Sequence, residues 1–135
     1  MPLVANETAV LHNLHYDGDL DADVETTTVL AGVSWHGKLI AQASSSGIAA
    51  ADLYKMRIFA GSSTAKPPGL AAPVDAEGAY LDPDAWAALP AAERAEHWTI
   101  QQGDKITCLG QTGTVLAIHD NRAGRLSPHW YVEAH

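Results

Sequence analysis

The C-terminal third of the chain alternates short apolar runs with turn-forming residues, and this pattern constrains the fold more than any other feature. The runs span residues 98–101, 105–109, 115–119 and 129–133, and Gly, Asn and Asp separate them. In the second run, Ile106 and Cys108 alternate with polar residues. A strand places successive side chains on opposite faces, and Gly, Asn and Asp favour tight turns. We therefore predict that residues 98–135 form a β-meander.

The N-terminal half contains three further stretches with strand character. Residues 7–16 alternate, which puts Leu11 on the same face as Asn13. Residues 26–30 are mostly β-branched, and residues 53–59 alternate around Met56. Gly37 is expected to end a strand, and the Ser/Ala-rich residues 41–51 are expected to form a surface loop with a short helix. Together with the meander, these stretches predict a mainly β fold, a small barrel or sandwich.

The remaining segments predict one short helix and long loops. The acidic run 17–25 contains no Lys or Arg and is expected to be a solvated loop, and residues 60–81 read as a long loop. Asp82 followed by Pro83 is a helix start, so a short helix should follow, with Trp86 on its buried face. Pro90 should end it, and residues 93–94 can form a second turn. We predict a single domain spanning 1–135.

Composition bounds the functional classes. The net charge is -8, and the eight Lys and Arg are spread along the chain with none before Lys38. Binding to phosphate backbones needs clustered cations, so sequence-independent nucleic-acid binding is disfavoured. Cys108 is the one cysteine, which leaves no partner for an intrachain disulfide. No apolar run reaches transmembrane length, so we expect no membrane association and synthesis in a reducing cytoplasm.

The acidic and histidine-rich segments do not match known metal motifs. A calcium loop beginning at Asp17 would need Gly and Glu where Ala22 and Thr28 stand. His12 and His15 are three residues apart, so they point to opposite faces of a strand. A composite histidine site that uses His119 and His129 stays open as a third hypothesis, a metal-dependent hydrolase. Our prediction names no metal ligand and no cofactor.

Nucleophilic catalysis has no local signature either. Ser44, Ser45 and Ser46 lack the Gly-x-Ser-x-Gly elbow, and Cys108 alternates like a small core residue rather than the thiol partner of His119. We therefore predict that the chain has no catalytic residue and is not an enzyme.

The tryptophans allow two interpretations. They are predicted to anchor the core of a small β domain. Alternatively, they form a surface that binds a carbohydrate or a protein. The four are Trp35, Trp86, Trp98 and Trp130.

Five segments taken together resemble a group of small neck proteins of tailed bacteriophages, the minor capsid or head–tail connector proteins encoded near the major capsid gene. Arg57-Ile58 is followed by Phe59, where the pattern has a proline. The segments, in order, are residues 28–35, 51–58, 80–86, 98–104, and 120–122 with 128–130.

This resemblance implies a structural virion protein of the head-closure type. Such proteins are small β-barrels that form dodecameric or hexameric rings between the portal and the tail. The implied partners are further copies of the chain, portal or adaptor subunits and tail subunits, with genomic DNA passing through the channel without specific binding. The acidic run 17–25 would then face the channel and repel DNA. The alternatives are a capsid decoration protein and a non-viral binding module that uses surface tryptophans.

Polar residues of the meander have two expected roles. Gly103-Asp104 and Asp120-Asn121 are interpreted as turn formers. Arg122 and His129 are the two residues of the meander expected to make specific contacts, within the subunit or across a ring interface.

Overall fold

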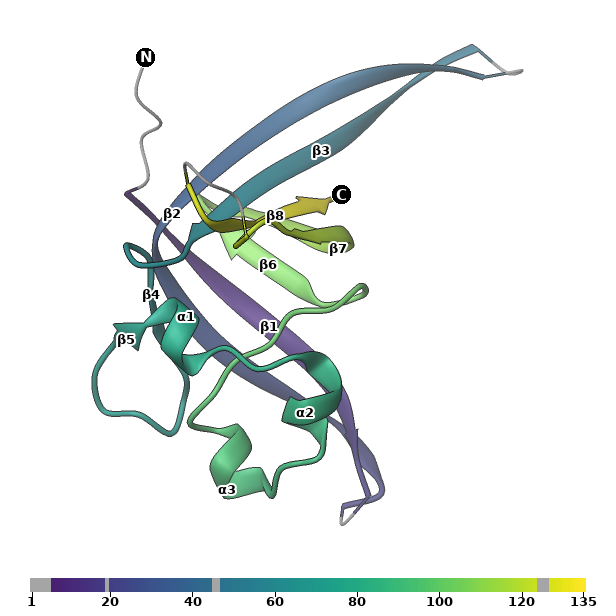
Figure 1. Ribbon diagram of the computed structural model, residues 1–135. Helices are drawn as coiled ribbons and strands as arrows, with labels where there is room; N and C mark the ends of the chain where they lie inside the picture. The colour runs from purple at the N-terminus through teal and green to yellow at the C-terminus, as the bar shows by residue number, and fades with distance from the viewer. Residues whose placement is uncertain (1–5, 19, 45–46, 124–126) are drawn as a thin grey trace.

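The computed structural model describes residues 6–18, 20–44, 47–123 and 127–135, and it is mainly β (Figure 1). Three short helices lie within the described ranges, where the sequence predicted one. The strands are β1 (Glu7–Asp17), β2 (Ala22–Ser44), β3 (Gly47–Phe59), β4 (Thr64–Lys66), β5 (Val74–Asp75), β6 (Lys105–Cys108), β7 (Gln111–Asp120) and β8 (His129–Ala134). The helices are α1 (Ala76–Ala79), α2 (Pro83–Ala87) and α3 (Ala91–Arg94).

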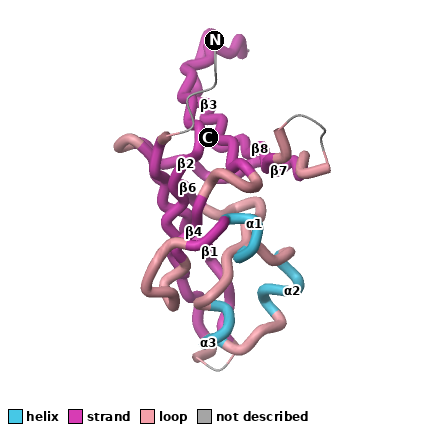
Figure 2. Tube along the Cα trace, turned by 60° about the vertical axis from the view of Figure 1, so that its left-hand side comes forward, coloured by secondary structure: helices cyan, strands magenta, loops and turns pink. Residues whose placement is uncertain are grey.

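Six strands form a closed antiparallel barrel. Their order is β1-β6-β7-β8-β3-β2, and pairing of β1 with β2 closes it. β4 and β5 extend the sheet beside β2. The predicted barrel and its meander of β6, β7 and β8 are therefore confirmed. Figure 2 shows the three helices on one side of the molecule.

The long strand β2 belongs to two hairpins. It pairs with β1 up to Val33 and with β3 from Ser34 onward. The prediction that Gly37 ends a strand is wrong, because Gly37 pairs with Tyr54 inside β2. A Cβ at Gly37 would lie 3.0 Å from Oε1 of Gln111 and 3.2 Å from Cδ1 of Tyr54. The glycine thus permits a close approach rather than a break.

The prediction of a surface loop with a helix at 41–51 is also wrong. The ladder of β2 and β3 continues through Ala41 opposite Ala50 to Ser44 opposite Gly47. Because β3 joins β8 only from Tyr54 onward, residues 38–44 and 47–53 pair only with each other within the described sheet. We call this two-stranded extension the β2–β3 arm; it projects from the barrel in Figure 1. Ala and Ser have weak strand preference, so their composition hid a ladder imposed by neighbouring pairs.

The turn within the acidic run 17–25 is shorter than predicted. β1 continues to Asp17 and β2 already begins at Ala22, so the second half of the run is paired strand. Its exposure is as expected, since Asp21, Asp23 and Glu25 are all exposed. Residue 19 lies outside the described residues, as do 45–46 of the predicted 41–51 loop and 124 of the predicted turn after β7.

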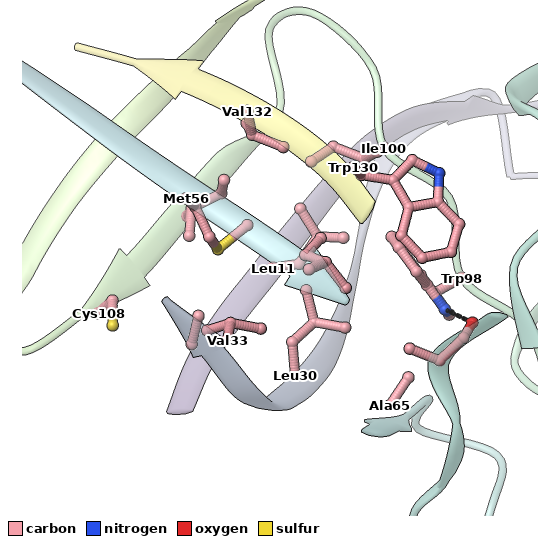
Figure 3. Close-up of a cluster of buried hydrophobic side chains, with 14 of the residues drawn as sticks. Leu11, Leu30, Val33, Met56, Ala65, Trp98, Ile100, Cys108, Trp130 and Val132 are labelled. Atoms are coloured by element: carbon pink, nitrogen blue, oxygen red, sulfur yellow. Dashed lines mark hydrogen bonds between the residues drawn. The ribbon is translucent and has the colours of Figure 1, made fainter. Parts of the chain in front are cut away.

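The core fills the barrel and the space under α1 (Figure 3). Three of the four tryptophans are buried, as predicted; Trp35 is half-buried and stacks on Tyr54 with ring centroids 5.1 Å apart. Tyr54, Met56 and Ile58 point inward from β3, which confirms the predicted strand face. The fully buried large side chains include Leu11, Leu30, Val33, Ile58, Ile106, Trp98 and Trp130.

The apolar pattern of residues 98–101 comes from contacts with α1 rather than from a sheet. Residues 98–101 form no strand, and Trp98 makes only an isolated bridge with Tyr80. Its backbone N–H donates to the Ala79 carbonyl at 3.1 Å and its indole N–H to the Ala76 carbonyl at 2.8 Å, both in α1. The prediction of a long loop over residues 60–81 is only partly right, because this segment contains β4, β5 and α1.

The predicted helix after Asp82 is confirmed as α2, and the second turn as α3. α2 ends at Ala87, so Leu89 lies beyond it, half-buried, while Trp86 is buried. The Trp86 indole N–H lies 3.2 Å from the Arg94 carbonyl and 3.3 Å from that of His97, which ties the two helices together.

Candidate interaction site

Arg122 clamps the connection between β7 and β8 onto the aromatic core. Its Nε donates to Oδ1 of Asp120 at 2.9 Å and its Nη2 to Oδ2 at 2.7 Å, a bidentate pair. The guanidinium carbon lies 4.7 Å from the Trp130 ring centroid and 4.9 Å from that of Tyr80. Tyr80 and Trp130 in turn pack against Trp98, with centroids 5.0 Å and 5.2 Å away.

The Asp120–Arg122 pair explains two sequence predictions. The Asp120 carboxylate also accepts the Arg122 backbone N–H at 3.1 Å, which is the turn-forming role predicted for Asp120. These hydrogen bonds lower the pKa of Asp120. The contacts that Arg122 was expected to make exist within the subunit. The pair is partly exposed, so its contribution to stability is modest.

His129 also contacts its own subunit. Its Nδ1 lies 2.5 Å from the Ser127 carbonyl, and its ring packs 6.1 Å from that of Phe59. His119 stacks on Tyr131 at 5.8 Å. In the part of the chain that the structure describes, no three His, Cys, Asp or Glu side chains gather closely enough to hold a metal ion.

Cys108 is a core residue, as predicted. It is 2 % exposed and its thiol lies 3.5 Å from the Thr8 carbonyl. Burial, aided by the charge of Glu7, raises the pKa of the Cys108 thiol to about 11. The thiol is therefore protonated at neutral pH, which opposes a nucleophilic role.

Asp104 is more than the predicted turn former. It is 2 % exposed, and its carboxylate accepts hydrogen bonds from Nδ2 of Asn13 (2.8 Å) and from the backbone N–H groups of Gln101 (3.0 Å) and Leu14 (3.3 Å). Asn13 also donates to the Thr99 carbonyl at 2.8 Å. The carboxylate thus joins β1 to the segment before β6. The sequence indicates this role in one way. Alternation puts Asn13 on the same face as Leu11, and a buried amide needs a hydrogen-bond partner.

The burial of Asp104 predicts a specific pH dependence of stability. Desolvation raises the pKa of Asp104 above its ordinary value of 3.8, although its hydrogen bonds oppose the rise. The folded state then holds this proton more tightly than the unfolded state, and its stabilising contribution is lost as pH rises through the folded pKa. We expect the stability of the wild type relative to Asp104→Asn to fall over that window and then level off. Urea unfolding at closely spaced pH values, from about 3 upward through the range in which aspartates titrate, measures this difference in stability. A constant difference between the two proteins would contradict it.

A hollow of about 190 Å³ lies between the β1–β2 hairpin and α3. His15 forms part of its wall and meets Trp86 edge-to-face at 4.9 Å, while its Nε2 lies 3.1 Å from Oγ1 of Thr26. Arg94 donates to the Leu89 carbonyl at 2.7 Å. The polar groups of the wall are thus largely bonded to the protein itself. The lining residues are His15, Val24, Glu25, Thr26, Thr27, Pro68, Ala91, Arg94 and Ala95.

Two surfaces of opposite character remain on the outside. The acidic hairpin face lies at the end of the β1–β2 hairpin, where the register pairs Leu14 with Glu25 and Tyr16 with Asp23. The basic–aromatic strip lies on the outside of β3, β8 and β7. We define it as Lys55, Arg57, Phe59, His119, His129 and Tyr131.

Comparison with known proteins adds the family. No helix among the described residues is long and apolar enough to cross a membrane. No curated protein and no solved structure matches the chain. One family model matches residues 4–135, nearly the whole sequence. The chain therefore belongs to the "Family of unknown function (DUF6751)".

Proposed function

We propose that this protein is a structural subunit of a tailed phage, a head–tail connector that assembles as a ring between portal and tail. The proposal combines the resemblance of the five segments with the closed β-barrel, from which the β1–β2 hairpin and the β2–β3 arm project. In this role the protein has no catalytic residue, and its partners are further copies of itself, portal or adaptor subunits and tail subunits. Assembly would take place in the bacterial host cytoplasm, and the final location would be the virion.

The β2–β3 arm is the observation that supports this proposal best. A two-stranded hairpin is marginally stable in water on its own. In the register of the arm, Ala41 of β2 stands opposite Ala50 of β3, and Ala43 stands opposite Ile48. An arm of this composition gains stability when a neighbouring subunit covers it, and its open edges can add strands.

The carbohydrate-binding alternative loses most of its basis. It requires tryptophans on the surface, but Trp86, Trp98 and Trp130 are buried, and Trp35 is half-buried against Tyr54. The surviving alternative is a capsid decoration protein, which would also use an arm to grip its neighbours.

Shortening the arm tests the proposal. Replacing residues 39–52 with Asn-Gly joins Lys38 to Leu53, which face each other in the ladder, by a two-residue hairpin turn. We expect the barrel to fold and to unfold in a single cooperative thermal transition, because the barrel core is untouched. Binding to the portal protein of the same phage should fall by tenfold or more, as measured by light scattering and sedimentation.

The full-length chain is the control in that experiment. Neighbouring genes supply an independent check, since a connector gene is expected close to portal and major capsid genes. The proposal would be contradicted if the chain did not bind the portal ring and if its gene had no portal or major capsid gene nearby. Binding to assembled capsids but not to the portal would favour the decoration protein.

A further inference from the structure

We propose that the acidic hairpin face of one copy docks on the basic–aromatic strip of the next copy, head to tail. The inference rests on the ring proposed above and names the contact between its subunits. It also assigns the acidic residues 21–25 to that contact rather than to the DNA channel.

The acidic hairpin face combines negative charge with exposed apolar area. Leu14 is 44 %, Tyr16 61 % and Leu20 68 % exposed, although large apolar side chains are usually covered. Asp23 and Glu25 stand opposite Tyr16 and Leu14 on the same face of the hairpin. No Lys or Arg precedes Lys38 in the sequence, and the basic contact that the hairpin itself gives Glu25 is His12, whose Nδ1 lies 2.5 Å from Oε1 of Glu25. Such a face suits a partner that is both basic and apolar.

The basic–aromatic strip has the complementary character. The Arg57 guanidinium carbon lies 5.0 Å from the Tyr131 ring centroid, and His119 stacks on the same ring. Phe59 and His129 continue the row, and Lys55 stands opposite Glu133, the acid nearest to it in the ladder. Arginine and aromatic residues are the side chains most enriched at the centres of protein interfaces.

The placement of the two surfaces fits contact between copies. In Figure 1 the hairpin end lies at the bottom of the molecule and strand β8 lies well above it, near the base of the β2–β3 arm, so a chain does not satisfy its own complementarity. Contact between two different surfaces is heterologous, and it produces a ring when the rotation closes. Nucleic acid is a poorer occupant of the strip, since two fixed cations beside Glu133 on a chain of net charge -8 give weak phosphate attraction.

Reciprocal charge exchange tests the contact. We expect Asp23→Lys with Glu25→Lys, and separately Lys55→Glu with Arg57→Glu, each to weaken self-association about tenfold or more at low salt. Mixing the two variants should restore it, because each then offers the face that the other requires. Sedimentation velocity over a concentration series measures all of these. The wild-type association should weaken as salt rises.

The controls separate this contact from unfolding and from net charge. Asp84→Lys with Glu96→Lys makes the same charge change at exposed positions in α2 and after α3, outside the acidic hairpin face, and should leave association unchanged. Thermal unfolding checks that each variant is folded, and the salt series on the wild type tests the contact without any variant. A wild type that stays monomeric at all concentrations, or a mixture that fails to associate, overturns the inference. Tight binding of a labelled oligonucleotide that Lys55→Glu with Arg57→Glu abolishes would overturn it too.

Portal binding, measured in parallel, distinguishes the two proposals. Copies that join the portal but show no charge-exchange rescue contradict the contact and leave the connector function standing. Rescue without any portal binding contradicts the connector function and leaves the contact standing.

Discussion

Trp98→Ala is expected to lower the free energy of unfolding by about 3–5 kcal/mol, the largest loss from any single side chain of the aromatic core. The Trp98 ring is fully buried and packs against both Tyr80 and Trp130. Its removal would leave a large void and would also leave the Ala76 carbonyl without its indole donor. Because that bond fastens α1 to the barrel, we expect the helical side of the molecule to loosen first.

Urea denaturation followed by circular dichroism measures this effect. Trp35→Ala is the matched control, since Trp35 is half-buried and stacks on one ring only, and it should cost about 1 kcal/mol. Amide exchange should show the added loss of protection concentrated in residues 76–98. Equal losses for the two variants would show that the Trp98 cluster is not the anchor described above.

Asp104→Ala is expected to destabilise the protein by about 3 kcal/mol or more, because it leaves one buried and two partly buried donors without their acceptor. The Asn13 amide and the backbone N–H groups of Gln101 and Leu14 all lose their acceptor. Asp104→Asn keeps one oxygen for the Asn13 and Gln101 donors, so its loss should be clearly smaller. Chemical denaturation at neutral pH gives both values.

A double-mutant cycle isolates the central hydrogen bond. Asn13→Ala removes one donor, so the double variant with Asp104→Ala should cost less than the sum of the two single losses. Asp84→Ala, at an exposed position, should change stability by a few tenths of a kcal/mol. Additive losses for Asn13→Ala and Asp104→Ala would show that the two side chains do not act together.

The sequence predicted the elements whose pattern comes from the sheet itself. β3, β6 and β8 bury alternate residues, so the period of two identifies them directly. The segment at Trp98 shows the same apolar spacing for a different reason, burial beneath α1, and periodicity alone does not separate the two causes. Gly113 lies inside β7, where a Cβ would come within 2.7 Å of Tyr54, although it reads as a turn residue.

The candidate surfaces were partly accessible from the sequence. Arg122 could be singled out because it follows Asp120 at the spacing of an Asx turn. The link from Asp104 to Asn13 joins residues far apart in the chain, so it depends on barrel closure and has no local signature. The basic–aromatic strip is similar, because it exists only once β3, β7 and β8 stand side by side.

The single strand β2 gives the two hairpins a mechanical connection. Its 23 residues have a contour length of roughly 75 Å at about 3.3 Å per residue, and they run without interruption from the acidic hairpin face into the β2–β3 arm. If each end holds a different neighbour, tension between subunits passes along covalent backbone. The ladders to β1 and β3 are then loaded in shear, with many hydrogen bonds sharing the force. The barrel would then hold the middle of β2 in place between the two contacts, and the same arrangement would repeat in each subunit around the assembly.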